Sequence, residues 1–194
     1  MYYGAYGANL NMSNMEVRCP QAKPMISFML KDYKLVFNGV ADIIKCKGAE
    51  VPIGLWKITD KCEKALDRFE GFPYLYKKIY INREIPGAKG KCMFYVMRRK
   101  GFNVPQAFYY NCIAQGYEDF GMDKDNLCWA AREAEQSQEL KLNLARKVSK
   151  NDDLELGVDW EYDWDGTHVH DHSKETTINL VKALKVVKRE IENE

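Results

Sequence analysis

Short runs of strand-forming residues, separated by turn signals, occupy most of the first hundred residues of this 194-residue chain. The clearest signal is Asn38-Gly39, a dipeptide that strongly favours a two-residue hairpin, between apolar runs at 33–37 and 40–44. Short sequential strands of this kind pair mostly antiparallel and curl into small barrels. We expect further strands at 1–6, 51–58, 76–85 and 91–97.

Helical signals alternate with these runs and then replace them. Thr59 or Asp60 caps a helix that Gly71 ends, which makes Glu70 its last residue. A short helix capped by Ser13 or Asn14 follows the first strand. After residue 105 the apolar spacing is helical, and we expect helices at 106–114, stopped by a glycine at 116, and from 125 to about 148. The sequence predicts an α+β fold, a small, mostly antiparallel β-barrel with flanking helices.

The length suits one domain. We expect that domain to span residues 1–149. Residues 150–194, an acidic loop and a C-terminal helix capped by Ser173, are expected to extend it. The periodicity of that helix leaves a monomer and a homodimer equally open.

Composition excludes several classes of function. With 29 basic and 28 acidic residues, the net charge of +1 predicts no nucleic acid partner and no anionic membrane. No apolar run approaches the roughly 18 residues of a membrane span. The six cysteines are scattered, and residues 1–11 lack the features of a secretory signal, so we expect reduced thiols and a cytoplasmic location.

All three histidines, His168, His170 and His172, alternate within five residues. On a strand these alternating side chains would share one face, as metal ligands can. The segment also resembles the H-x-H-x-D-H motif of metallo-β-lactamase-like hydrolases, but it is one residue shorter than that motif. We interpret the segment as a polar loop and expect no metal site.

The segment from Tyr3 to Asn9 contains two glycines and two alanines, Gly4, Ala5, Gly7 and Ala8. Small side chains at the end of a strand leave backbone N–H groups exposed, and such groups bind carboxylates and oxyanions. A simple turn is the alternative interpretation.

Glu70 is the second candidate. A carboxylate at the C-terminal end of a helix is unfavourable for the helix dipole. Its neighbours Phe69, Phe72 and Tyr74 would desolvate it and raise its pKa toward a value useful for a general base. The local sequence alone favours an exposed glutamate at a helix end.

Three segments together resemble the γ-glutamylcyclotransferase-like family. The run Tyr6-Gly7-Ala8-Asn9-Leu10 is similar to its Y-G-S-N-L loop, with alanine in place of serine, and Glu70-Gly71 is similar to its catalytic E-G segment. A late P-Q…Y-x-x-x-I-x-x-G stretch is matched by Pro105-Gln106, Tyr109, Ile113 and Gly116. Arg18 and Pro20 also fit the family pattern, and the resemblance covers about residues 2 to 130.

The resemblance implies a small barrel and an intramolecular reaction. The α-amino group of a γ-glutamyl unit attacks its own γ-carbonyl, giving 5-oxoproline and a free amine or amino acid. Glu70 is implied as the general acid and base. The backbone N–H groups at Gly7 and Ala8 would hold the oxyanion, and Tyr3, Tyr6 and Tyr109 would wall the pocket. The expected partner is a small γ-glutamyl substrate, with no cofactor.

Two other hypotheses remain open. The same fold can serve as a binding module that holds a small carboxylated ligand or a protein without turnover. The histidine segment would instead indicate a metal-dependent hydrolase, which we rank last.

Overall fold

The computed structural model of the protein describes residues 1–81, 85–87 and 90–149. Residues 1–144 form one compact unit, and the second unit, 145–194, lies largely outside the described residues. The predicted extension at 150–194 and the segment with His168, His170 and His172 therefore fall outside the part that the structure describes.

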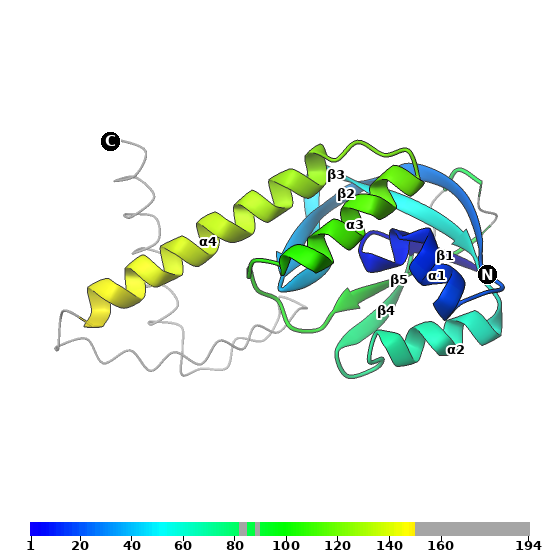
Figure 1. Ribbon diagram of the computed structural model, residues 1–194, viewed down its shortest axis with the longest axis horizontal. Helices are drawn as coiled ribbons and strands as arrows, with labels where there is room; N and C mark the ends of the chain where they lie inside the picture. Colours follow the sequence, from blue (N-terminus) through cyan, green and yellow to red (C-terminus); the bar gives the residue numbers. More distant parts are fainter. Residues whose placement is uncertain (82–84, 88–89, 150–194) are drawn as a thin grey trace. The chain divides into compact units, whose positions relative to one another are not determined.

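A five-stranded sheet with the order β2-β3-β1-β5-β4 forms the centre of the first unit (Figure 1). Its strands, in chain order, are Tyr2–Ala5, Lys23–Asn38, Val40–Lys57, Tyr76–Ile81 and Cys92–Met97. The β1–β5 ladder is parallel and the other three are antiparallel. The predicted α+β fold with mostly antiparallel pairing is confirmed. The barrel is a loose one, since no ladder among the described residues joins the edge strands β2 and β4.

The β2–β3 hairpin turns at Asn38-Gly39, as the sequence predicts, with Gly39 at φ +74°. Both strands are longer than predicted. Strand β3 continues through Gly48, where φ is +82°, and the Gly48 N–H donates a 3.2 Å hydrogen bond to Asp32 Oδ1. The pairing register shifts between Lys31 and Tyr33. The apparent break between the predicted strands is therefore a bulge within one strand.

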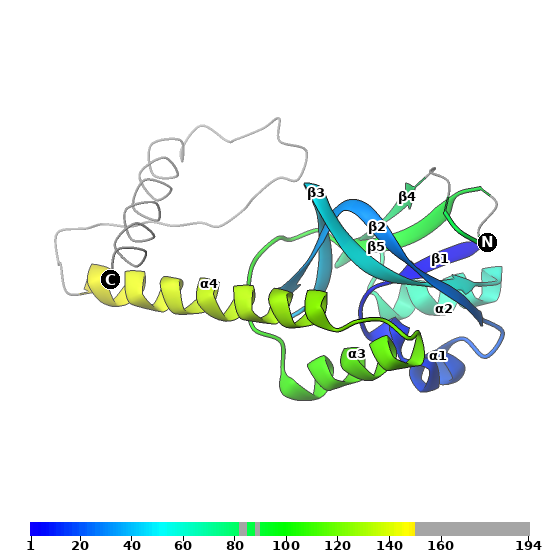
Figure 2. The same ribbon diagram turned by 90° about the horizontal axis from the view of Figure 1, so that it is seen from above.

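Among the described residues, four α-helices and a short 3-10 helix accompany the sheet. They are η1 (Ala8–Leu10), α1 (Met12–Arg18), α2 (Asp60–Phe69), α3 (Ala107–Asp119) and α4 (Asp125–Ser149). In Figure 2, α1 and α3 lie on the same side of the sheet. Thr59 caps α2 as predicted, and its hydroxyl accepts from the Cys62 N–H at 3.3 Å. The predicted cap of α1 is wrong, because Asn11 rather than Ser13 or Asn14 caps that helix.

Gly116 does not stop α3, contrary to the prediction. The helix continues to Asp119, and Gly116 faces η1. A Cβ at this position would lie 2.5 Å from Leu10 Cβ and 2.6 Å from the backbone nitrogen of Asn11. The glycine therefore permits close approach of two backbones rather than ending a helix.

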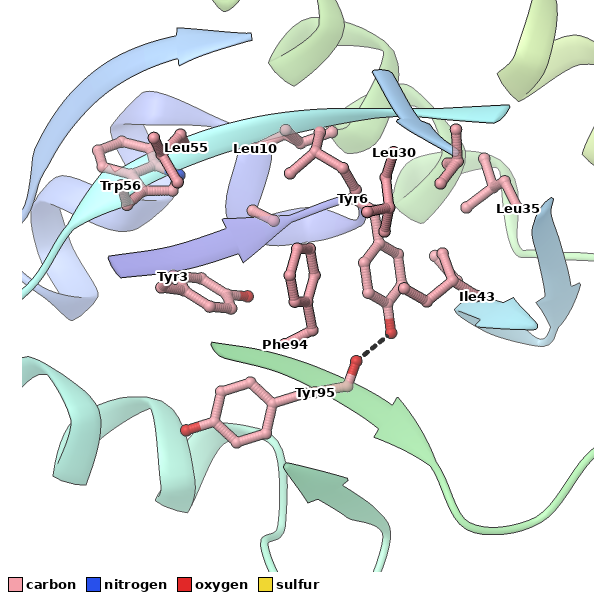
Figure 3. Packing of buried hydrophobic residues seen from close by; sticks show 14 of the residues in the cluster. Tyr3, Tyr6, Leu10, Leu30, Leu35, Ile43, Leu55, Trp56, Phe94 and Tyr95 are labelled. Carbon is pink, nitrogen blue, oxygen red and sulfur yellow. Dashed lines mark hydrogen bonds between the residues drawn. The ribbon is translucent and has the colours of Figure 1, made fainter. Parts of the chain in front are cut away.

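Buried side chains fill the space between β1, β3, β5 and the helices (Figure 3). Gly4 lies against the Phe94 ring, which a Cβ would overlap. All six cysteines are free thiols, and Cys19, Cys62 and Cys92 are buried. None of the helices that the structure describes is long and apolar enough to cross a membrane.

Candidate active site

The end of α2 fixes the position of Glu70. Gly71 has φ +61°, and the N–H of Phe72 donates to the Asp67 carbonyl at 2.9 Å, while the Gly71 N–H donates to the Arg68 carbonyl at 3.3 Å. These two bonds form a Schellman motif, which requires a left-handed residue after the helix cap. Glu70 is that cap, with φ −78° and ψ −4°. The backbone at this position is therefore defined by its own sequence, Glu70-Gly71.

The loop after β1 forms a tight turn that leads into α1. The Leu10 N–H donates to the Gly7 carbonyl at 2.9 Å and the Asn11 N–H donates to the Ala8 carbonyl at 3.3 Å. The N–H groups of Gly7, Ala8 and Asn9 take no part in closing this turn. The small residues of the loop thus leave these three backbone donors outside the turn's own hydrogen bonds, as the sequence predicts.

Asn9 joins this loop to Glu70. Its side-chain nitrogen donates to Glu70 Oε1 at 2.8 Å and to the Tyr3 hydroxyl at 2.9 Å. Asn9 is 3% exposed; its bond to Tyr3 is buried and its bond to Glu70 is partly buried. Asn9 of η1 therefore links two other predicted site residues, Tyr3 of β1 and Glu70 at the end of α2, through its own hydrogen bonds.

The environment of Glu70 favours its protonated form. Burial raises the pKa of Glu70 to about 7, against opposing contributions from the Arg18 charge and the Asn9 hydrogen bond. A carboxyl with a pKa near 7 exchanges a proton readily at neutral pH. The raised pKa is consistent with the predicted desolvation of Glu70, but the three neighbours named for it are all exposed: Phe69 49%, Phe72 37% and Tyr74 86%.

Tyr109 reaches the same loop from α3. Its hydroxyl oxygen accepts from the Ala41 N–H at 3.1 Å and also from the Ala8 N–H. A Cβ on Gly7 would lie 3.3 Å from this oxygen, so Gly7 leaves room for the hydroxyl group. Burial raises the pKa of Tyr109 to about 12, and the phenol stays protonated at neutral pH.

The other predicted residues of the loop lie in the sheet or the core. Gly4 and Ala5 belong to β1 and pair with Leu55 and Gly54 of β3. The Tyr6 side chain is 6% exposed, and its hydroxyl donates to the Tyr95 carbonyl at 2.5 Å (Figure 3). These residues fix the position of the loop, and their side chains form no hydrogen bond with Asn9 or Glu70 among the described contacts.

Tyr76 belongs to the site and is missed by the motifs. Burial and the nearby Glu70 charge both raise its pKa, and its hydroxyl donates to the Ala41 carbonyl at 3.4 Å. In the sequence it appears only as the first residue of a strand. The one available signal is the large number of tyrosines, 12 in the chain, since tyrosine often lines clefts that are partly polar.

The arrangement is suited to acid–base chemistry on an uncharged acyl group. It combines one carboxyl of near-neutral pKa, backbone N–H donors and phenols that stay protonated. Within the described ranges, no group of three or more metal-ligating side chains is present.

Comparison with known proteins identifies the family of this chain. A family model described as gamma-glutamyl cyclotransferase, AIG2-like, matches residues 3–114. A human protein named gamma-glutamylcyclotransferase is 28% identical over 137 residues, which are 62% of this chain and 71% of the human protein.

Solved structures share the fold. One of a gamma-glutamyl cyclotransferase has a TM-score of 0.56 at 21% identity and covers 92% of this chain and 98% of its own. The YkqA protein of Bacillus subtilis has the same score and identity, covering 70% of this chain and 54% of its own. The match over residues 3–114 includes both the Tyr6–Leu10 loop and Glu70. The chain belongs to the gamma-glutamyl cyclotransferase, AIG2-like family.

Proposed function

We propose that this protein cyclises a γ-glutamyl compound to 5-oxoproline and releases an amine or an amino acid. The observation that carries the proposal is the hydrogen bond from Asn9 to Glu70, which holds a carboxyl of near-neutral pKa beside the Tyr6–Leu10 loop. In the reaction, the α-nitrogen forms a bond to the γ-carbon, and the bond from that carbon to the leaving nitrogen breaks.

Glu70 acts as the base and then as the acid. The α-amino group of the substrate is an ammonium ion at neutral pH, and it must lose a proton before it can attack. Glu70 takes one proton from this ammonium before attack and gives it to the departing nitrogen. The second proton that the α-nitrogen loses as the lactam forms passes to solvent, and the released amine takes one up to become an ammonium ion. A pKa of about 7 suits both transfers, because neither form of the carboxyl is strongly disfavoured at neutral pH.

The Tyr6–Leu10 loop holds the negative charge that develops on the γ-oxygen. The N–H groups of Gly7 and Ala8 are the donors in this proposal. The Ala8 N–H bonds to the Tyr109 hydroxyl in this structure, so substrate either replaces that hydroxyl or accepts a bond from it. Because these donors are backbone groups, alanine in place of the family's serine is compatible with the reaction.

Tyr3 and Tyr109 hold the glutamyl chain in its folded form. The oxygens of both phenols accept from N–H donors of the protein, Asn9 for Tyr3 and Ala41 for Tyr109. Their own protons are therefore free to point at oxygens of a ligand. Ring closure is unimolecular, so holding the reacting atoms close together supplies much of the rate. Gly4, Ala5 and Tyr6 act by positioning the loop.

A substrate panel tests the proposal. The full chain is incubated with γ-glutamyl amino acids, γ-glutamyl-lysine-type amines and glutathione, and 5-oxoproline and glutamate are measured by mass spectrometry. We expect 5-oxoproline without glutamate from at least one compound. Release of glutamate would indicate hydrolysis instead. Binding of these compounds without turnover would contradict the enzyme and favour the binding module.

The proposal also covers the partner and the location of the protein. The partner is a small γ-glutamyl molecule, held by a monomer or a homodimer. The cytoplasm is the proposed location, which is consistent with six free thiols.

A further inference from the structure

Arg18 contacts both segments that bring the candidate site together. It is the last residue of α1, and its guanidinium donates a hydrogen bond to Asn9 Oδ1. The same guanidinium lies over the ring of Phe69, with Cζ 3.3 Å from the ring centroid. Phe69 is the last residue of α2 and directly precedes Glu70. Arg18 therefore connects η1 to the end of α2 through one group.

The contact with Arg18 fixes the orientation of the Asn9 amide. A guanidinium group only donates hydrogen bonds, so the oxygen of Asn9 must face Arg18. The amide nitrogen then faces the other way, and its two hydrogens match two acceptors, Glu70 Oε1 and the Tyr3 hydroxyl. A reversed amide would direct its oxygen at the Glu70 carboxylate and its N–H groups at Arg18, and so lose the bonds to both residues.

Arg18 also acts on Glu70 through its charge. Five phenols also interact electrostatically with Glu70, and burial raises the pKa of each, which keeps them uncharged at neutral pH: Tyr3, Tyr6, Tyr76, Tyr95 and Tyr109. Among the described residues, Arg18 is the cation that lowers the pKa of Glu70 against the effect of burial.

We propose that Arg18 is a positioning residue, which holds the Asn9 amide in the orientation that bonds Glu70 and stabilises the ionised carboxylate. The inference rests on the proposed function for its meaning in catalysis, but the effect on Glu70 exists in the free protein. Ionised Glu70 is the form that accepts a proton from substrate. Arg18 thereby determines how much of the protein carries an active base at a given pH.

Three substitutions separate the two effects. Arg18→Lys keeps the charge and one donor. Arg18→Gln keeps an N–H donor for Asn9 but removes the charge, and Arg18→Met removes both. Arg68→Gln is the matched control, since Arg68 is exposed on the last turn of α2 and its loss removes the same charge near Glu70. Circular dichroism confirms that each variant is folded.

The first measurement needs no substrate. Carboxyl ¹³C NMR of glutamate-labelled protein follows the ionisation of Glu70, whose signal is assigned by its loss in Glu70→Gln. We expect the midpoint to rise by about one pH unit or more in Arg18→Gln and Arg18→Met, the usual scale for loss of a neighbouring opposite charge. It stays near the wild-type value in Arg18→Lys and Arg68→Gln. An unchanged midpoint in Arg18→Gln and Arg18→Met would overturn the inference.

The second measurement is the pH profile of turnover on a compound that the substrate panel identifies. In Arg18→Gln we expect kcat/KM to fall about fivefold at pH 7 and to recover by pH 9, because Glu70 ionises there. In Arg18→Met recovery is incomplete, since the Asn9 amide is no longer held. A rise in KM alone, with the profile unmoved, would show that Arg18 binds substrate and would contradict the positioning role. If nothing is turned over, the proposed function fails while the NMR titration still decides the inference.

Discussion

The side-chain amide of Asn9 donates a 2.8 Å hydrogen bond to Glu70 Oε1 and so joins two segments that are 61 residues apart. The bond explains how a glutamate at an ordinary helix end becomes part of a site. It connects the Glu70 carboxyl to the loop that follows β1, and burial of this junction raises the pKa of Glu70 to about 7.

The first prediction concerns the pH dependence of the wild-type enzyme. Glu70 accepts a proton only when it is ionised, so we expect kcat/KM to rise with pH through a midpoint of about 7. Initial rates of 5-oxoproline formation between pH 5 and 9 measure this rise of kcat/KM with pH. A flat profile below pH 7, or a midpoint near the ordinary glutamate value, would contradict the assigned base.

The second prediction concerns stability. The folded protein raises the pKa of Glu70 from 4.5 to about 7, so the unfolded chain ionises this group more easily than the folded one. Ionisation therefore costs stability as pH rises from about 4.5 to 7, and the cost is complete above 7. We expect Glu70→Gln to be more stable than wild type by about 1–3 kcal/mol at pH 8.

Urea unfolding of both proteins at pH 4 and pH 8 measures this effect. The difference should nearly vanish at pH 4, where the carboxyl is protonated in both states. A variant that is less stable than wild type at pH 8 would show that Glu70 is a stabilising residue and would contradict the account.

Much of this site follows from sequence because its parts are local. The Schellman motif at Glu70-Gly71 and the turn at Gly7 depend on residues that are neighbours in the chain. The contact between these two segments does not depend on neighbouring residues, because no local sequence pattern predicts that Asn9 bonds to Glu70. The family resemblance supplied that pairing. The positions of Arg18 and Tyr76 depend on packing between elements, and only the structure gives them.

The strands also differ in whether they can be predicted from neighbouring residues alone. The hairpin turn at Asn38-Gly39 is a local signal and is predicted correctly. The first half of β2 was not predicted, because most of the side chains from Lys23 to Asp32 are exposed and the run lacks a buried alternating face. Pro24 fits this location, since proline is tolerated on an edge strand.

The third prediction concerns Lys78, which supports the end of α2 that precedes Glu70. Its Nζ lies 2.6 Å from Glu63 and 2.7 Å from Asp67, and its side chain is only 11% exposed. Asp67 also accepts a 2.6 Å bond from the Tyr95 hydroxyl. Lys78→Met leaves two carboxylates together without a counter-ion, and we expect a loss of about 2–4 kcal/mol in urea unfolding.

Lys124→Met is the control for Lys78→Met. Lys124 forms a comparable pair with Glu118, but the two side chains are 40% and 55% exposed. Solvent screens such a pair, so the expected change is within about 0.5 kcal/mol. Equal losses in the two variants would show that the Lys78 cluster has no special role in holding α2.

The fourth prediction concerns Gly116, where α3 meets η1. Alanine normally stabilises a helix interior by about 1 kcal/mol relative to glycine. Here the added Cβ overlaps Leu10 and the backbone of Asn11, so we expect Gly116→Ala to destabilise the protein by about 1–3 kcal/mol. Asn111→Ala, at an exposed position of the same helix, should be neutral or slightly stabilising. Thermal unfolding of both variants tests the packing, and a stabilised Gly116→Ala would contradict it.

The most direct test of the central claim compares 5-oxoproline formation by wild type, Glu70→Gln and Glu16→Gln on the best substrate of the panel. Glu16 is an exposed glutamate of α1, so its substitution makes the same chemical change away from the site. We predict a loss of at least about 10²-fold in kcat for Glu70→Gln, the usual scale for a general base, and no loss for Glu16→Gln. Equal turnover by wild type and Glu70→Gln would contradict the account.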